Sequence, residues 1–480
     1  MRLLPVLLLT ACWQSAATPQ RRISLSSCRL KGTGLQAQCG KLRVPEDRAH
    51  PEKRQIDLRI AVVPALARAP AADALFLLAG GPGQAATEVI GPLLGAFERL
   101  HRTRDMVLVD QRGTGSSRPL RCDLNAPGAP LAERLRADAL AEEKFRKCLA
   151  DYDADPRFYT TSIAMQDLDE VRDALGYDQI DLWGGSYGTR AALVYLREHG
   201  QHARAAVLDG VAPPSLKLPV TFARDAQRSM DLLFAHCAAE KSCSTAFPNL
   251  QARFENLLAG LSKRPARAHL ADPLTGVPAD VEISRDVFAA GLRGVLYQQD
   301  FASLAPLIID RAARGDFAPF VAATAGLDQG FSRTMSFGMM LSVICSEDLT
   351  GTTGQEIDDA AKGTFLGPRL AREFLKTCAF WPRGRAPPRE AIKSDKPVLL
   401  LSGELDPVTP PRWADEARAT LPNSAHFVVP GVGHGASAEG CVPQLIERFI
   451  TDGSLQKLDP ACLKPLRRPP FFVSFAGPPP

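Results

Sequence analysis

The sequence lacks the features that most directly assign a chain to nucleic-acid binding, metal binding or a membrane span. Its 57 Lys and Arg are nearly balanced by 53 Asp and Glu, and the net charge of +4 provides no dense basic stripe for binding phosphates. No CxxC spacing occurs, which argues against a zinc site. No repeat of solenoid or propeller period is visible, and beyond the N-terminus no stretch reaches the roughly 18 apolar residues of a membrane span. We therefore expect no nucleic-acid partner, no metal and no cofactor.

The composition is that of an ordinary folded protein. Hydrophobic residues make up 45% and charged residues 23% of the 480 residues, so most of the chain can bury a core. This length fits two or three average domains, or one large α/β domain with an inserted subdomain. Composition therefore indicates a globular protein and leaves the number of domains open.

The N-terminus has the layout of a secretory signal, which we place at residues 1–19. One Arg precedes a short apolar run, too short to span a bilayer, and small residues follow it. The run ends in Leu9-Thr10-Ala11-Cys12, which resembles a bacterial lipobox, in which Cys12 would be lipidated and become the mature N-terminus. Cleavage near Ala16-Ala17 and an unprocessed apolar start are the alternatives. Either route of processing predicts export, to the bacterial periplasm or outer surface or into the medium, with membrane attachment only through the lipid.

Cysteine usage also favours export. Without Cys12, ten of the eleven cysteines remain, and they fall into couples that are near in sequence. The couples are Cys28 with Cys39, Cys122 with Cys148, Cys237 with Cys243, Cys345 with Cys378, and Cys441 with Cys462. An oxidising compartment would let these couples close loops as disulfides. Spacing does not prove connectivity, and plain buried cysteines are the alternative for any one pair.

The hydrophobic pattern predicts a mostly parallel sheet that a helical segment interrupts. Residues 36–65 indicate an antiparallel strand pair, and residues 73–81 and 105–113 contain short apolar runs typical of strands buried on both faces. The strand and helix rhythm continues to residue 211, breaks at Pro213-Pro214, and returns only at residues 396–407.

We therefore divide the chain after the signal into three parts. Residues 20–214 form the first part of an α/β core, residues 215–391 a mainly helical insertion, and residues 392–480 the second part of the core. The insertion would lie over the carboxyl edge of the sheet, where open α/β sheets bind ligands, and is predicted to be a cap or lid.

The motif Gly184-Gly185-Ser186-Tyr187-Gly188 fits G-x-S-x-G and lies between a predicted strand and a predicted helix. Glycines on both sides permit the strained turn that exposes a Ser hydroxyl at a helix N-terminus. A simple Gly-rich turn is the alternative. Because the context matches, we predict that Ser186 is a nucleophile and that the chain has the α/β-hydrolase fold, with a mostly parallel central sheet and a helical cap inserted between core strands.

A Ser nucleophile needs a His that accepts its proton and an acid that orients the His, and in this fold both follow the Ser. The strand that follows the insertion ends at Glu404-Leu405-Asp406, and we choose Asp406 because it begins the DPVTP turn, with Glu404 as the alternative. Only His426 and His434 follow this acid. His426 opens a predicted strand, whereas His434 lies in a Gly-rich loop, and we predict that His434 is the base.

The segment Ala79-Gly80-Gly81-Pro82-Gly83 follows the first predicted parallel strand, where this fold supplies an oxyanion-hole donor. Pro82 has no N–H to donate. We therefore predict that the amides of Gly81 and Tyr187 form the oxyanion hole, with a simple tight turn as the alternative.

Taken together, GGPG, DQRGTGSS at residues 110–117, GGSYG, DPVTP and VGHG resemble the proline iminopeptidase and tripeptidyl aminopeptidase branch of the α/β-hydrolases. The resemblance spans about residues 35 to 450. It is greatest to secreted bacterial proteins with a TAP-like C-terminal region, which share the early Cys pair, the CSED segment and the Cys that follows VGHG. One departure is Ala79, which stands where many proline iminopeptidases have the His of HGGPG and weakens an expectation of strict prolyl specificity. The resemblance implies aminopeptidase chemistry on short peptides.

The leading functional hypothesis is an exported serine exopeptidase that removes one to three residues from peptide N-termini through an acyl-enzyme on Ser186. A serine esterase or amidase acting on small molecules with the same triad is the alternative, and a non-catalytic binding protein is a third. The expected partner is a peptide or a small acyl substrate.

An exopeptidase also needs a carboxylate for the cationic α-amino group of its substrate. Glu347 and Asp348 follow Cys345 within the insertion, and a bond from Cys345 to Cys378 would hold them in place. We predict that this pair binds the amine, with Glu347 ahead of Asp348 by the family resemblance. A solvated acidic loop or a helix N-cap is the alternative.

Overall fold

The computed structural model describes residues 23–122, 124, 129–135 and 142–478. The predicted signal segment, with Cys12, lies outside these residues. Within them, no helix is both long enough and apolar enough to cross a bilayer.

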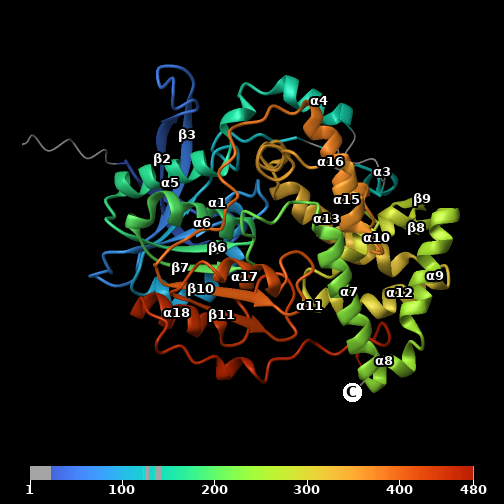
Figure 1. Cartoon of the computed structure of the whole chain (residues 1–480). Helices are drawn as coiled ribbons and strands as arrows, with labels where there is room; N and C mark the ends of the chain where they lie inside the picture. The colour runs from blue at the N-terminus through green and yellow to red at the C-terminus, as the bar shows by residue number, and fades with distance from the viewer. Residues whose placement is uncertain (1–22, 123, 125–128, 136–141, 479–480) are drawn as a thin grey trace, which may run out of the picture.

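A nine-stranded sheet forms the core of the molecule (Figure 1). Its order is β1-β2-β3-β5-β4-β6-β7-β10-β11, antiparallel from β1 to β5 and parallel from β5 to β11. The strands are β1 Ser26–Arg29, β2 Gln36–Pro45, β3 Gln55–Val63, β4 Ala74–Leu78, β5 Met106–Val109, β6 Ile180–Gly185, β7 Ala203–Asp209, β10 Val398–Gly403 and β11 Ser424–Val429. The expected mostly parallel sheet is thereby confirmed.

Helices cover both faces of the sheet, which is why its central strands are mainly apolar. On one face, α5, α6 and α17 pack against the first core cluster, and on the other η1, α2 and α18 pack against the second. These helices are α5 Thr161–Leu175, α6 Tyr187–His199, α17 Pro411–Arg418, η1 Gly91–Phe97, α2 Glu98–His101 and α18 Val442–Asp452. Smaller elements of the core part are α1 Ala86–Val89, α3 Leu131–Arg134, α4 Glu142–Asp151, η2 Pro156–Phe158, η3 Gly200–His202 and η5 Pro460–Leu463.

Between β7 and β10 the chain forms a helical body beside the sheet, which we call the cap (Figure 1). The cap has its own apolar core, which contains Phe254, Phe288 and Phe320. Its helices are α7 Phe222–Ala239, α8 Lys241–Ala246, α9 Leu250–Lys263, α10 Arg285–Val295, α11 Gln299–Ala302, α12 Ala305–Ala313, α13 Ala318–Thr334, α14 Phe337–Val343, α15 Gly354–Ala361 and α16 Arg369–Phe380. It also contains a hairpin of β8 Ala266–Ala271 and β9 Pro278–Ile283 and a π-helical turn, η4 Ile344–Asp348. The domain boundaries given above stay predictions.

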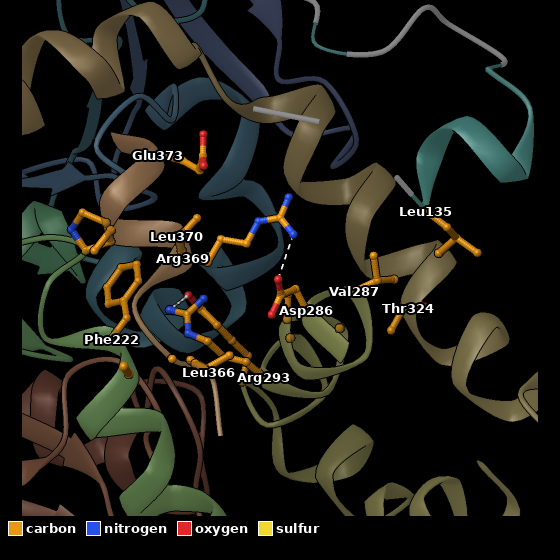
Figure 2. Close-up of a pocket in the computed structure, with 18 of the residues that line it drawn as sticks. Leu135, Phe222, Asp286, Val287, Arg293, Thr324, Leu366, Arg369, Leu370 and Glu373 are labelled. Carbon is orange, nitrogen blue, oxygen red and sulfur yellow. Dashed lines mark hydrogen bonds and ion pairs between the residues drawn. The ribbon is translucent and has the colours of Figure 1, made fainter. Parts of the chain in front are cut away.

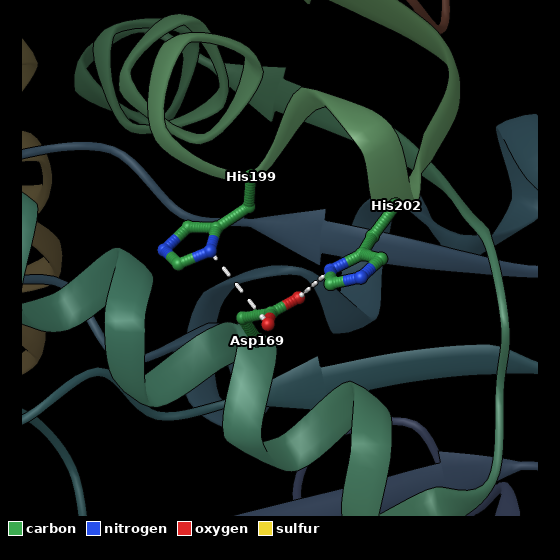
Figure 3. A group of neighbouring side chains, drawn as sticks. All are labelled: Asp169, His199 and His202. Atoms are coloured by element: carbon green, nitrogen blue, oxygen red, sulfur yellow. Dashed lines mark hydrogen bonds and ion pairs between the residues drawn. The ribbon is translucent and has the colours of Figure 1, made fainter.

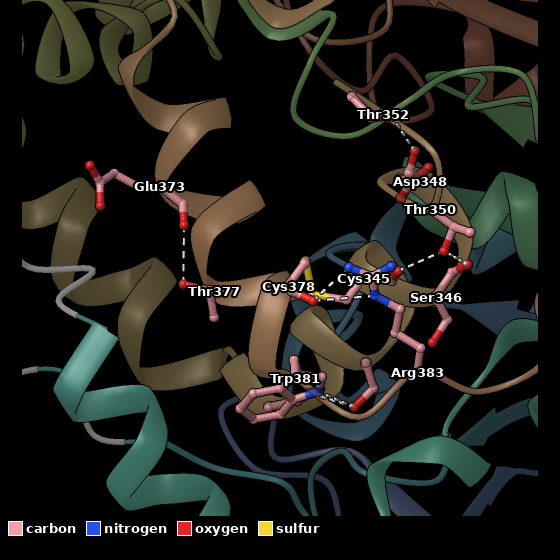
Figure 4. The surroundings of a disulfide bond; sticks show 12 residues. Cys345, Ser346, Asp348, Thr350, Thr352, Glu373, Thr377, Cys378, Trp381 and Arg383 are labelled. Atoms are coloured by element: carbon pink, nitrogen blue, oxygen red, sulfur yellow. Dashed lines mark hydrogen bonds between the residues drawn. A yellow bond between two sulfur atoms is a disulfide. The ribbon is translucent and has the colours of Figure 1, made fainter. Parts of the chain in front are cut away.

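The structure joins all five cysteine couples as disulfides. The longest loop in sequence is closed by Cys345–Cys378, which ties the π-helical turn to α16 (Figure 4). Disulfides at these positions agree with folding in an oxidising compartment.

The C-terminal segment runs from the core part to the cap. Arg468 passes the end of β11 beside Gly431 and forms an ion pair with Glu240, which lies between α7 and α8. Phe471 is 2% exposed within the apolar core of the cap, and the Phe472 amide donates to the Ser303 carbonyl at 3.1 Å. This segment, which the sequence pattern left uninterpreted, therefore connects the two bodies.

Candidate active site

Ser186 lies at the junction of β6 and α6, with backbone angles φ 56° and ψ −122°. A positive φ is unfavourable for a residue with a side chain and marks a strained turn. The flanking glycines make the turn possible, because a Cβ at Gly188 would collide with the carbonyl oxygen of Leu78 on β4. The Ser186 amide donates to the carbonyl of Asp209 at 2.8 Å. The sequence therefore builds a sharp strand-to-helix turn at the carboxyl edge of the sheet, with Ser186 at its apex.

His434 and Asp406 are hydrogen-bonded, with 2.7 Å between His434 Nδ1 and Asp406 Oδ2. Asp406 is fully buried and also accepts hydrogen bonds from the amides of Val408 and Thr409, at 2.7 and 2.8 Å. Burial opposes ionisation of this carboxyl, but the His434 charge and the amide donors outweigh it and hold the pKa of Asp406 below its ordinary value. Burial likewise opposes protonation of His434, and Asp406 outweighs it and raises the pKa of the imidazole.

The two alternative residues lie in other surroundings. Glu404 accepts a hydrogen bond from the Gly431 amide at 2.8 Å. His426 lies between Asp415 and Ser402, at 2.9 and 3.0 Å. The structure therefore brings Asp406 and His434 together and gives Glu404 and His426 partners of their own.

Asp209 connects the Ser186 turn to the loop that carries His434. Its carbonyl accepts a hydrogen bond from the Ser186 amide, and its carboxylate accepts hydrogen bonds from the amides of Ala436 and Ser437, at 2.8 Å each. A Cβ at the next residue, Gly210, would lie 3.2 Å from His434 Cε1. No hydrogen bond joins Ser186 Oγ to His434 in the described chain, and such contacts often tighten only when substrate binds. Sequence reasoning missed Asp209, although an Asp before Gly at the end of an apolar strand was the available signal.

The predicted oxyanion-hole loop lies against Ser186. A Cβ at Gly80 would be 3.1 Å from the Ser186 Cβ, a tight approach that favours glycine. Gly81 has φ 108°, a conformation that favours glycine, and precedes a cis peptide bond to Pro82. Tyr187 is the first residue of α6, so its amide is one of the unsatisfied donors of a helix N-terminus. The loop thus lies against Ser186 through Gly80, and the roles of the Gly81 and Tyr187 amides as donors stay predictions.

Glu347 and Asp348 lie in a buried network beneath the N-terminus of α6, with exposed fractions of 4% and 1%. The Glu347 carboxylate accepts from the amide and hydroxyl of Thr161, at 2.7 and 2.8 Å, and the same hydroxyl contacts the Tyr187 hydroxyl at 2.7 Å. Asp348 is paired with Arg190 on α6 at 2.9 Å. The pair therefore lies in a buried π-helical turn, where Thr161 donates hydrogen bonds to Glu347 and Arg190 pairs with Asp348, and the alternative of a solvated acidic loop is wrong. Neither residue lines the cavity described next, and their role as an amine anchor stays a prediction.

A cavity of about 550 Å³ lies between helices of the cap and the segment of α3, and none of Ser186, Asp406 and His434 is among the residues that line it (Figure 2). Its wall is mainly apolar and includes Leu131, Val287, Phe320, Val321, Leu366 and Leu370. Tyr297, another wall residue, accepts a hydrogen bond from the His434 amide at 2.7 Å through its carbonyl, and its ring packs edge-on at 5.4 Å from the imidazole. Tyr297 therefore connects the cavity wall to the predicted base.

A second group of side chains has the composition of a metal site. Atoms of Asp169, His199 and His202 lie within 4.8 Å of one another (Figure 3). The Asp169 carboxylate, however, also accepts hydrogen bonds from Arg172 and Tyr195, at 2.8 Å each. This cluster lies at the C-terminal end of α6, opposite the end at Ser186, and the Arg172 charge already compensates its carboxylate.

The sheet order, the Ser186 turn and the buried Asp406–His434 pair together define a serine hydrolase of the α/β-hydrolase fold.

Known proteins of similar sequence or structure indicate which serine hydrolases this chain resembles. Residues 363–462 match the family of TAP-like proteins. Serine protease Hip1 of Mycobacterium tuberculosis (strain ATCC 25618 / H37Rv) is 26% identical, over 87% of this chain and 86% of that protein. Tripeptidyl aminopeptidase of Streptomyces coelicolor is 25% identical, over 88% of this chain and 83% of that protein. Among solved structures, proline iminopeptidase of Mycobacterium smegmatis has a TM-score of 0.39 and 17% identity, over 86% of this chain and 98% of that chain. The resemblance read from the motifs is confirmed: the chain has the α/β-hydrolase fold, and its residues 363–462 are similar to TAP-like proteins.

Proposed function

We propose that this serine hydrolase is an exported exopeptidase that releases short N-terminal fragments from peptides through an acyl-enzyme on Ser186. The observation that carries the proposal is the shared anchoring of Ser186 and the His434 loop on Asp209, next to a cavity in the cap. The names of two similar proteins, a serine protease and a tripeptidyl aminopeptidase, support peptides as substrates.

In the proposed reaction, His434 takes the proton of the Ser186 hydroxyl as its oxygen attacks the scissile carbonyl carbon. Asp406 holds His434 Nδ1 and stabilises the imidazolium that forms. The amides of Gly81 and Tyr187 donate to the oxyanion. His434 then gives its proton to the leaving amine, and a water that His434 activates hydrolyses the acyl-enzyme.

Export and attachment belong to the same proposal. The five disulfides agree with a compartment outside the cytosol. We propose that residues 1–19 direct export and that Cys12 is lipidated. Palmitate incorporation that a Cys12→Ser substitution abolishes would support the anchor, and an unlabelled wild type would contradict it.

Two measurements test the enzymatic proposal. A fluorophosphonate probe should label the wild type and the Ser162→Ala variant, whose Ser162 hydroxyl contacts Glu198, but should not label Ser186→Ala. A panel of aminoacyl and peptidyl arylamides with free or acetylated N-termini, beside p-nitrophenyl esters, then identifies the substrate class. Preferred cleavage of free-amine peptidyl arylamides is expected. Hydrolysis of esters with no arylamide cleaved would show an esterase instead.

A further inference from the structure

Arg293 is the charged side chain of the cap cavity that has no ion-pair partner among the described residues. Five charged side chains line the cavity, and the other four are compensated. Their pairs are Arg134 with Asp272 at 2.7 Å, Asp286 with Arg369 at 2.8 Å, and Glu373 with Lys376 at 3.3 Å. Arg293 therefore leaves one uncompensated positive charge on a mainly apolar wall (Figure 2).

The guanidinium of Arg293 is held in place by two aromatic rings. Its Cζ lies 4.1 Å from the ring centroid of Phe222 and 5.1 Å from that of Tyr297. One of its nitrogens donates to the Tyr297 hydroxyl at 3.0 Å, whereas Nε is buried and has no hydrogen-bond partner in the described chain. Because a guanidinium carries five N–H donors in a planar fork, most of its hydrogen-bonding capacity remains for a ligand.

Arg293 is also close to the predicted base. The Tyr297 ring that it stacks on lies 5.4 Å from the imidazole of His434, so one aromatic ring contacts both residues. A single aromatic ring therefore separates Arg293, on the cavity wall, from His434, which does not itself line the cavity.

The chemistry that fits this position is a carboxylate. A carboxylate binds a guanidinium through two parallel hydrogen bonds, and the apolar wall strengthens the attraction by excluding water. A neutral or cationic side chain at the same position would leave Arg293 uncompensated after displacing its water. Uncharged apolar parts of the substrate can occupy the rest of the cavity.

We infer that Arg293 binds a carboxylate of the substrate and that the enzyme prefers N-terminal fragments with Asp or Glu near the cleaved bond. This inference rests on the proposed function, because it places the released fragment in the cap cavity.

The test compares kcat/KM for free-amine peptidyl arylamides that differ only in Glu against Gln, at each position of the released fragment. At one position the wild type should favour Glu by roughly 10- to 100-fold, the range expected for a charge-assisted bidentate pair. Arg293→Met should bring this ratio to about 1, and Arg293→Lys should keep part of it because the charge remains. Arg264→Met is the matched control: Arg264 is exposed at the end of α9, and this substitution should leave the ratio unchanged.

A second pair of substrates separates the inference from the proposed function. These are p-nitrophenyl esters whose acyl chains end in a carboxylate or in its methyl ester. A Glu to Gln ratio of about 1 at every position, in an enzyme that cleaves the arylamides, would overturn the inference and leave the exopeptidase intact. If no arylamide is cleaved but the esters are, the proposed function fails. A preference for the carboxylate ester that Arg293→Met removes would then support the inference, and equal rates would overturn it.

Discussion

At the scale of single residues, Asp406 has the most specific predicted effect. Asp406→Asn should lower turnover by about 10,000-fold, because the amide favours the wrong imidazole tautomer of His434. The protein should still fold, since the substitution keeps the shape of the side chain. Glu404→Gln is the control and should change turnover little, because Glu404 contacts the Gly431 amide and not His434. The measurement is kcat on a p-nitrophenyl ester. A large loss in Glu404→Gln and none in Asp406→Asn would reverse the assignment.

Chain order and loop context predicted that Asp406 and His434 lie together. In this fold the acid and the histidine follow the nucleophile in the sequence, and few candidates remain after Ser186. The burial of individual polar residues and their contacts with distant parts of the chain could not be predicted from the sequence. The Asp209 carboxylate accepts hydrogen bonds from the amides of Ala436 and Ser437, more than 200 positions away in the sequence. No local sequence pattern predicts a contact over this separation. Glu347 is polar in sequence but buried in the fold, and only the positions of Thr161 and Arg190 explain why.

At the scale of elements, the buried π-helical turn predicts how stability depends on pH. Burial raises the pKa of Glu347 to about 7 from its ordinary value of 4.5, although Arg190 and Thr161 oppose the shift. At a pH between these two values, Glu347 is therefore protonated in the folded state and ionised in the unfolded state. This contribution to stability is fully present below pH 4.5 and is lost as pH rises through about 7.

Glu347→Gln removes this titration, so its melting temperature should fall less than that of the wild type between pH 5 and about 7.5. Thermal unfolding across this pH range measures the difference. Glu373→Gln is the comparison variant, because it changes a half-buried carboxylate. Its melting temperature should depend on pH as that of the wild type does. Parallel curves for the wild type and Glu347→Gln would contradict the burial argument.

The disulfide between Cys345 and Cys378 should stabilise the cap more than the one between Cys237 and Cys243. The two bonds span 33 and 6 positions, and loop-closure entropy then gives about 4 and about 2 kcal/mol of unfolding free energy. All four cysteines are buried, so replacing each pair with serines adds a similar polar cost. Denaturant unfolding of the two double variants tests the order. An equal loss would show that native-state packing outweighs chain entropy.

The secondary structure was most predictable where apolar runs were continuous, as in the core strands β4, β5 and β10. The β8–β9 hairpin was not predicted, although its exposure alternates along both strands. Such short strands pair within an otherwise helical segment, and a two-residue period over six residues is easily lost beside long helical patterns. The π-helical turn was not predictable from local pattern, because a buried ion pair and a disulfide fix it.

At the scale of the whole molecule, the C-terminal segment should contribute to stability through Phe471. This side chain is 2% exposed in the cap core, and Phe471→Ala should reduce the free energy of unfolding by about 3 to 5 kcal/mol. Phe475→Ala is the matched control: Phe475 is 68% exposed, and its loss should change stability by about 0.5 kcal/mol or less. Chemical denaturation of both variants decides whether the segment is structural.

The same segment has a consequence for the choice of substrates. This segment connects the core, beside Gly431, to the cap, at Glu240. We therefore expect the cap to keep one position relative to the core rather than to open and close. A cap that stays in place beside the sheet limits the approach of a folded protein, whereas an unfolded chain end can enter. For the exopeptidase proposed above, we therefore expect cleavage of short or unfolded peptides, including fragments that other proteases produce, and no cleavage of folded proteins.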